Sequence, residues 1–147
     1  MLDEIVLRVV NRLAYKQAIK KVQRPDKAKK LIVSGIKECR RTLTTIIDKK
    51  KSRMLVVAVN VERNPYKGGV DDQVQGTIEL AQELKIPIIY ASTRSNLGRA
   101  FTGKWGPRIT MVSIVNFEGY QDMVEEMLGE WQKACQQYDE ISDFIVN

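Results

Sequence analysis

Lys30-Leu-Ile-Val-Ser-Gly-Ile-Lys-Glu-Cys-Arg-Arg-Thr-Leu43 joins an apolar run, a glycine and a cluster of charged residues. Its apolar start predicts a short strand over 31–34, and Gly35 predicts a turn. The pattern after the glycine predicts a helix over about 36–48. A strand, a glycine and a helix N-terminus together form a ready anion site, because free N–H groups point outward and the helix dipole adds positive potential.

The first two turns of this predicted helix carry four charged residues, Lys37, Glu38, Arg40 and Arg41. Cations are usually disfavoured there, because they lie near the positive end of the helix dipole. We interpret the cations as contacts for RNA backbone and Glu38 as an acceptor for a guanine edge. In the alternative interpretation, Glu38 bonds back to the N-cap N–H of Gly35, as glutamate often does at the third helical position, and the cations form a solvated face.

Length and composition are those of one ordinary globular domain. The 147 residues are 44% apolar and 29% charged, which suits a single domain over 1–147 with a sizeable core. No apolar run approaches the roughly 20 residues of a membrane span. The N-terminus also lacks the basic and apolar regions of a signal peptide. We therefore expect no membrane partner and an intracellular setting, in the cytoplasm, the nucleus or both.

The chain has no histidine and only two cysteines, Cys39 and Cys135. Without histidine, Ser-His-Asp and Cys-His nucleophile pairs and the usual zinc sites are excluded. The glycine motifs G-x-x-x-x-G-K-[ST] and G-x-G-x-x-G are also absent. Carboxylate-pair and lysine chemistry stay open, but no pattern favours them. We predict a binding protein that is not an enzyme, with no catalytic residue, metal or cofactor.

The net charge of +6 conceals an asymmetry between two parts of the chain. Residues 1–53 hold 16 Lys and Arg against 5 Asp and Glu, a net charge of +11. Residues 54–147 hold 8 against 13, a net charge of −5. A basic front and an acidic back favour an oriented encounter with a polyanion. The alternative is that the scattered cations serve only solubility.

Hydrophobic periodicity predicts alternating helices and strands along the rest of the chain. Apolar residues at helical spacing mark the helices, and nearly continuous apolar runs mark buried strands. The helices are predicted over 1–23, from Asp71 or Asp72 onward, over 94–100 and over about 119–145, and the strands over 54–60, 86–91 and 109–115. This alternation predicts an α/β fold, a three-layer α-β-α sandwich with a central mixed sheet of about four strands.

The same patterns predict the buried faces and ends of these elements. In the helix after the glycine turn, Ile46 or Ile47 should face the core, and the lysines at 49–51 should close the helix at its negative end. Leu84 should lie on the buried face of the next helix. The Ser-Thr pair at 92–93 should supply the N-cap of the short helix that follows.

Two motifs resemble those of a known family. Gly35-Ile-Lys-Glu-Cys-Arg-Arg41 matches the signature Gly-x-Asn/Arg-Glu-x-x-Lys/Arg, and Leu97-Gly98-Arg99 matches a Leu-Gly-Arg that follows the third family strand. Both are typical of the kink-turn-binding ribosomal-protein superfamily, which includes archaeal and eukaryotic large-subunit ribosomal proteins, a small nucleolar RNP core protein and SECIS-binding protein 2. The resemblance covers roughly residues 24–128, and the family's known fold is the expected sandwich.

Three features resemble the SECIS-binding branch of this superfamily. Pro25-Asp-Lys-Ala-Lys29 precedes the first strand, and Lys67-Gly-Gly-Val-Asp-Asp72 is similar to the branch's Lys-Gly-Gly-Leu-Asp-Asp. Lys37 stands where ribosomal members have Asn and this branch has Arg. Lysine cannot accept a hydrogen bond as asparagine can, so this position departs from the ribosomal pattern.

The resemblance implies binding to an RNA kink-turn, or to a related internal loop with tandem sheared G·A pairs. The backbone at the glycine turn would approach the RNA, the carboxylate would accept from a guanine edge, and the cations would hold phosphates or bases. The loop after the Leu-Gly-Arg motif would cover an expelled base. The implied RNA-binding residues are Gly35, Ile36, Lys37, Glu38, Arg40, Arg41, Lys67, Gly68, Gly69, Leu97, Gly98, Arg99, Lys104 and Trp105.

Two of these segments have competing interpretations. Trp105 either stacks on the expelled base, worth about 1–3 kcal/mol, or is a core or lid residue. The 67–69 segment either makes a second contact with the RNA stem or forms a turn that sets the cap of the next helix.

Three functions follow from the resemblance. The first is recognition of a SECIS-like kink-turn in selenoprotein messenger RNA, and the second is binding of ribosomal or small nucleolar RNA in RNP assembly. The third is a protein-interaction scaffold, because some superfamily members bind proteins. The acidic last helix either packs on the first helix or offers a surface to ribosome or RNP proteins. The signature and the basic front favour RNA.

Overall fold

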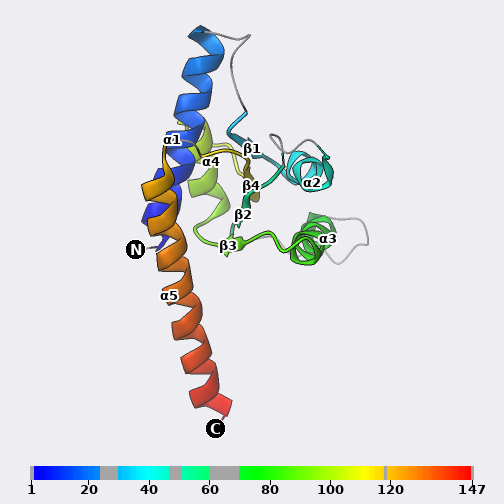
Figure 1. Ribbon diagram of the computed structural model, residues 1–147, viewed down its shortest axis with the longest axis vertical. Coiled ribbons are helices and arrows are strands. Elements are labelled where there is room, and N and C mark those ends of the chain that lie inside the picture. Colours follow the sequence, from blue (N-terminus) through cyan, green and yellow to red (C-terminus); the bar gives the residue numbers. More distant parts are fainter. Residues whose placement is uncertain (1, 24–29, 47–50, 60–69, 118, 147) are drawn as a thin grey trace.

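The structure, a computed structural model, describes residues 2–23, 30–46, 51–59, 70–117 and 119–146, although not the side chains of 70–72 and 137–146. Five helices and four strands alternate along these residues (Figure 1). The helices are α1 Leu2–Gln23, α2 Ile36–Thr44, α3 Val70–Glu83, α4 Arg94–Thr102 and α5 Gln121–Val146, and the strands are β1 Ile32–Ser34, β2 Met54–Val57, β3 Ile88–Tyr90 and β4 Met111–Ile114.

The strands form one mixed sheet in the order β1-β4-β2-β3. β4 is antiparallel to both β1 and β2, whereas β2 and β3 are parallel. The last residues of β1, β2 and β3 therefore meet the first residues of β4 at one edge, which we call the Gly35 edge. The opposite edge, where β2 and β3 begin and β4 ends, we call the Arg53 edge.

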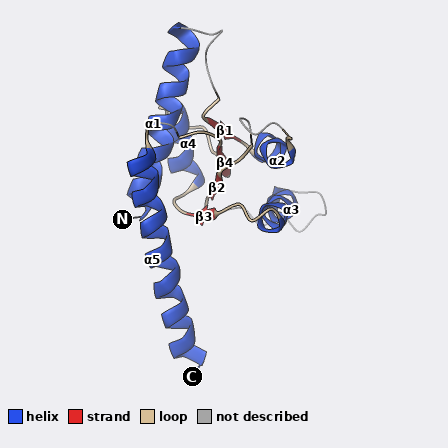
Figure 2. Ribbon diagram, viewed as in Figure 1, coloured by secondary structure: helices blue, strands red, loops and turns tan. Residues whose placement is uncertain are grey.

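Helices cover both faces of the sheet. Figures 1 and 2 show α1, α4 and α5 on one face and α2 and α3 on the other. Val6, Val10 and Met127 pack in the larger core, and Leu43 and Ile78 pack in the smaller one between the sheet, α2 and α3. This arrangement confirms the predicted α-β-α sandwich. Helix α5 packs on α1, which was one of the two alternatives predicted for the last helix.

A glutamine of α1 completes the exposed side of the edge strand β1. The Gln17 Oε1 atom accepts from the N–H groups of Leu31 at 2.6 Å and Ile32 at 3.0 Å, and its Nε2 donates to the Ile32 carbonyl at 3.1 Å. An edge strand otherwise presents unpaired backbone groups to solvent. The side chain therefore acts as a substitute neighbouring strand and joins α1 to the start of the glycine stretch.

Helix α2 is shorter than predicted. Thr45 has left the helical conformation, at φ −69° and ψ 143°. Ile46 is 97% exposed, so its predicted burial is wrong, and Ile47, the other residue predicted to face the core, lies outside the described residues. The physical cause is that the Ser52 N–H donates to the Thr42 carbonyl at 3.0 Å, a carbonyl that a longer helix would pair with Ile46. The helix ends before the lysines at 49–51, of which 49 and 50 lie outside the described residues.

Two further boundaries also differ from the prediction. β2 ends at Val57, and Val59 is 63% exposed beyond it. Leu84 is 41% exposed, because α3 ends one residue earlier and the chain turns there. Ile86 takes its place against the smaller core.

Candidate nucleic-acid interface

The turn at Gly35 joins β1 to α2 in a backbone conformation that favours glycine. Its φ is 92° and ψ 148°, a region nearly closed to residues with a Cβ. The Gly35 N–H donates to the Met111 carbonyl at 3.0 Å, and the first helical bond is from Cys39 N–H to the Gly35 carbonyl at 3.0 Å. Within the described chain, the N–H groups at 36–38 have no acceptor, so the positive end of α2 is open.

Glu38 is not a capping residue. The Gly35 N–H to which it was expected to bond back is occupied by Met111, so that alternative is wrong. The Glu38 Oε1 atom instead lies 3.4 Å from Arg41 Nη1, and these side chains are 41% and 67% exposed. Exposed ion pairs of this kind contribute little to stability, and the carboxylate is therefore available for an external donor.

The other residues of the signature point in different directions. Lys37 is exposed. Arg40 is also exposed and leans toward α3, since a Cβ at Gly76 would lie 3.8 Å from its Nη1. Ile36 is half buried and packs against the smaller core. It contributes to this surface through its backbone.

Cys39 lies in the middle of the signature but is buried and chemically quiet. Burial raises the pKa of its thiol to about 12, so the thiol stays protonated at neutral pH and is a poor nucleophile. Its Sγ donates weakly to the Val33 carbonyl at 3.9 Å. The cysteine therefore fixes α2 on the sheet.

Helix α4 carries the loop that follows it. Leu97 is fully buried, and a Cβ built on Gly98 would overlap the carbonyl of Pro107. The loop thus lies directly on α4 at Gly98, in a contact too close for any side chain. Leu97 and Gly98 position the loop, and neither offers a side chain to a ligand.

The exposed part of this loop holds a stacked pair. The Arg99 guanidinium lies 4.2 Å from the centroid of the Trp105 ring, a distance typical of a cation–π contact. Trp105 is 65% exposed, so the interpretation as a core residue is wrong. Lys104 is exposed beside it, with its N–H donating to Thr102 Oγ1 at 3.2 Å.

Backbone bonds bring the turn and the loop to the same edge of the sheet. Met111 receives Gly35, and the carbonyl of the preceding Thr110 accepts from Ala58 N–H at 2.8 Å. Ile109 N–H donates to the Arg94 carbonyl at 3.0 Å. The start of β4 therefore connects the α2 turn, the end of β2 and the start of α4. Lys67, Gly68 and Gly69 lie outside the described residues.

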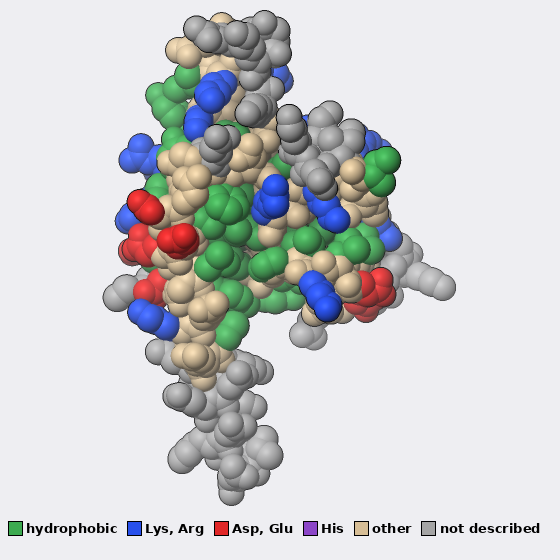
Figure 3. All heavy atoms as spheres, viewed as in Figure 1, with side chains coloured by type: hydrophobic (Ala, Val, Ile, Leu, Met, Phe, Trp, Pro, Cys, Tyr) green, Lys and Arg blue, Asp and Glu red, His purple; other side chains and the backbone are tan. Residues whose placement is uncertain are grey.

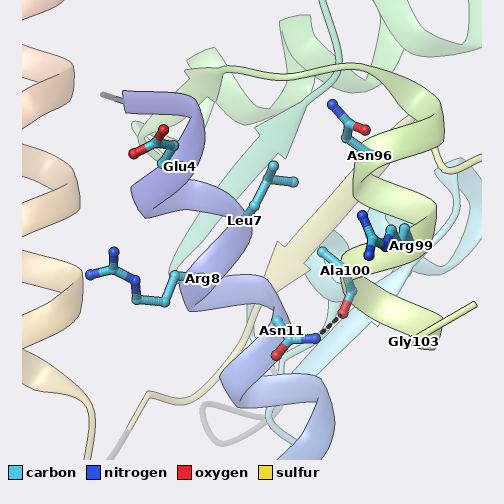
Figure 4. Close-up of a pocket in the computed structure, with 8 residues that line it drawn as sticks. All are labelled: Glu4, Leu7, Arg8, Asn11, Asn96, Arg99, Ala100 and Gly103. Carbon is cyan, nitrogen blue, oxygen red and sulfur yellow. Dashed lines mark hydrogen bonds between the residues drawn. The ribbon is translucent and has the colours of Figure 1, made fainter.

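A groove of about 560 Å³ runs between α1 and α4 beside this loop (Figure 4). Figure 4 shows Leu7, Asn96 and Arg99 pointing into the gap, while Arg8 points away from α4. The Asn11 Nδ2 atom donates to the Ala100 carbonyl at 3.0 Å and joins the two helices. Among the described residues, the lining is Glu4, Leu7, Arg8, Asn11, Asn96, Arg99, Ala100 and Gly103.

Residues of α1 that position this surface were missed from sequence. Asp3 Oδ1 accepts from the Ser92 N–H at 3.0 Å, and Ser92 has a φ of 66°. This bond fixes the turn that leads into α4. The only signal in the sequence is a polar residue next to an apolar stripe, which is ordinary in a surface helix.

A family sequence model matches most of this chain, including the Gly35 turn and α4. The sequence model of the ribosomal protein L7Ae/L30e/S12e/Gadd45 family matches residues 16–124. The chain belongs to this family. Membership confirms the superfamily that the two motifs resembled.

Curated relatives carry names from the SECIS-binding branch. The chain is 30% identical over 138 residues to Selenocysteine insertion sequence-binding protein 2 of Rattus norvegicus, a match that covers 94% of this chain and 15% of that protein. It is 27% identical over 115 residues to Selenocysteine insertion sequence-binding protein 2-like of Homo sapiens, covering 78% of this chain and 10% of that protein. The chain thus spans a small part of the length of these relatives.

Solved structures agree on the fold. A structure titled Giardia lamblia 15.5kD RNA binding protein superimposes with a TM-score of 0.62 and 16% identity, covering 90% of this chain and 88% of the other. A Bacillus halodurans protein of unknown function superimposes with a TM-score of 0.54 and 9% identity, covering 82% and 94%. At these identities the likeness shows the fold alone.

Neither a membrane span nor a metal cluster is found in the described parts of the chain. No helix there is both long enough and apolar enough to cross a bilayer. No three His, Cys, Asp or Glu residues of the described chain come together as possible metal ligands.

Proposed function

We propose that this chain binds structured RNA at the Gly35 edge and recognises a kink-turn or SECIS-like internal loop with tandem sheared G·A pairs. The observation that carries the proposal is the exposed Glu38 carboxylate, which is free of the Gly35 N–H and lies beside unpaired N–H groups. In this proposal Glu38 accepts from a guanine edge. Lys37 and Arg41 hold the neighbouring phosphates or bases, and Arg40 lies beside them. Sequence-specific RNA recognition usually targets loops and bulges, because their bases are unstacked and their edges are accessible.

The second part of the site is the Arg99–Trp105 pair. One face of the Trp105 ring is covered by the guanidinium, and an expelled base would stack on the exposed ring at a gain of about 1–3 kcal/mol. Lys104 would face the phosphate of that nucleotide. The 67–69 segment remains a proposed second contact with the RNA stem.

For the RNA itself, we propose a SECIS-like element in selenoprotein messenger RNA, in the cytoplasm, the nucleus or both. The names of the curated relatives support this choice. The alternative is a kink-turn in ribosomal or small nucleolar RNA, supported by the ribosomal proteins in the family name. The acidic α5 is the surface proposed for ribosome or RNP proteins, and Figure 3 shows acidic side chains gathered over it. A protein-interaction scaffold would use the same helix.

Binding of paired RNAs tests the proposal directly. A kink-turn RNA should bind more tightly than the same RNA with its sheared G·A pairs replaced by Watson–Crick pairs, in titrations at two salt concentrations. Binding of both should weaken with salt, because neutralised phosphates release counterions. Equal affinity for the two RNAs would overturn specific recognition.

A further inference from the structure

A second basic surface lies at the Arg53 edge, across the sheet from the proposed RNA site. It is a hollow of about 450 Å³ between the segments that lead into β2 and β3. Its described lining contains three cations and no carboxylate: Lys51, Ser52, Arg53, Lys85, Ile86 and Pro87.

The first segment holds two cations outward because the serine between them is anchored inward. Ser52 is 3% exposed, and its N–H donates to the Thr42 carbonyl at 3.0 Å. Its hydroxyl lies 2.8 Å from the Ser113 hydroxyl. The Arg53 N–H pairs with the Ile114 carbonyl at 2.8 Å, continuing the sheet. Lys51 and Arg53, on either side of this buried serine, both line the hollow, and Arg53 is exposed.

The third cation occupies a strained backbone position. Lys85 has a φ of 58°. Its N–H donates to the Gln82 carbonyl at 3.1 Å, and the next N–H, of Ile86, donates to Ala81 at 2.9 Å. These two bonds form a Schellman ending of α3, whose left-handed residue is usually glycine or asparagine. A residue with a Cβ is strained in this left-handed conformation, and such strain concentrates at functional surfaces.

We propose that the Arg53 edge is a further RNA contact, separate from the Gly35 edge and from the 67–69 segment, and that it binds the phosphate backbone of an RNA helix outside the internal loop. The inference rests on the proposed function for its class of partner. Arg53 and Ala58 stand at the two ends of β2, five residues and so about 17 Å apart, and one phosphate cannot contact both edges. The described lining has three cations and no carboxylate, which suits the phosphates of a polyanion, and it offers no Trp or Tyr to anchor a protein partner.

Binding measurements with two RNAs distinguish the contribution of the Arg53 edge from that of the Gly35 edge. One is a minimal internal-loop RNA with short stems, and the other has the same loop with one long stem. The wild-type chain should bind the long RNA more tightly and with a steeper salt dependence. The variant Lys51→Ser/Arg53→Ser/Lys85→Gly should lose this gain, with a salt slope lower by about 0.9 per phosphate contact removed, while binding the minimal RNA as before.

The single variant Lys85→Gly guards against an effect of misfolding. Glycine relieves the strain at this position, so the melting temperature should stay or rise while the salt slope on the long RNA falls by about one contact. Lys85→Arg should keep the slope. Lys133→Ser, which removes one charge from α5, is the matched control for net charge, and an equal effect from it would overturn the proposal.

Three outcomes would contradict the RNA contact at the Arg53 edge. One is no gain from the long stem, and another is a gain that survives in the triple variant. The third is displacement of the long RNA by a polyglutamate peptide at lower charge concentration than by plain RNA duplex, which would assign the surface to an acidic protein. If the minimal RNA bound no more tightly than its version without sheared G·A pairs, the proposed function would be overturned. The Arg53 edge could still be tested by itself, because its cations should also strengthen the binding of a plain RNA duplex.

Discussion

Helices α2 and α4 both begin at the Gly35 edge, both are nine residues long, and their N-termini differ. α4 is capped by its own chain, since Thr93 Oγ1 accepts from the Asn96 N–H at 3.2 Å. α2 starts at Gly35 without a side-chain cap, and its first turns carry Lys37, Arg40 and Arg41. A threonine cap stabilises a helix by about 1 kcal/mol relative to alanine, and a glycine cap such as Gly35 is only about a few tenths of a kcal/mol less favourable than threonine.

The difference separates a helix that supports the site from one that is part of it. The N-terminus of α4 is satisfied internally, and its buried residues hold the loop of Trp105. The N-terminus of α2 is open and surrounded by exposed charge. Unsatisfied N–H groups and cations at one helix end are unfavourable in the free protein and favourable once an anion binds there.

The largest effect is expected from breaking the support at Gly98. A Cβ there would overlap the Pro107 carbonyl, and Gly98→Ala should destabilise the fold by about 3 kcal/mol, the upper part of the range for overpacking. Urea denaturation checks this value. The control is Gly129→Ala in α5, where a Cβ has nothing within 4 Å and should stabilise by roughly 0.5–1 kcal/mol. Similar values for both would mean that the loop does not rest on α4.

Glu38→Gln tests whether α2 is part of the site. A carboxylate offers acceptors to both donors of a guanine edge, whereas an amide must present an N–H to one of them. RNA affinity should fall by about 1–3 kcal/mol, with the melting temperature nearly unchanged. Titration and thermal melting on the same preparation measure both. Unimpaired or improved binding would remove Glu38 from the recognition of bases.

Thr93→Ala tests the supporting role of α4. Loss of the cap should lower the free energy of unfolding by about 1 kcal/mol without weakening the binding of a minimal kink-turn RNA. Thr93→Ser keeps the hydroxyl and should restore most of the stability. If affinity fell as far as in Glu38→Gln, the two helix starts would share one role.

Arg41→Ala should have the smallest effect. Removing one phosphate contact should lower the salt slope of RNA binding by about 0.9, for every RNA sequence alike. Affinity measured across a series of salt concentrations gives the slope. Lys133→Ala is the matched control and should leave it unchanged. An unaltered slope in Arg41→Ala would exclude this guanidinium from the phosphate contacts.

Most of the fold could be predicted because its signals are local. Apolar runs mark the buried strands and helical spacing marks the helices, so the order of elements and the three layers followed from pattern. The ends were harder to predict. α2 stops at Thr44 because Ser52 takes the Thr42 carbonyl, a bond between segments that no local pattern contains.

Of the candidate site, sequence alone determined its charged residues and its glycine. The signature at 35–41 and the Leu-Gly-Arg motif are contiguous, and contiguous residues carry their own chemistry. Tertiary structure decided which of them are available. The Met111 carbonyl accepts from the Gly35 N–H, so the Glu38 carboxylate does not cap the helix and lies beside Arg41 on the surface. The Pro107 carbonyl explains why position 98 needs glycine, and Arg99 stacks on an exposed Trp105. These contacts join residues that only folding brings together, because hydrogen bonding and steric overlap depend on distance in space and not along the chain.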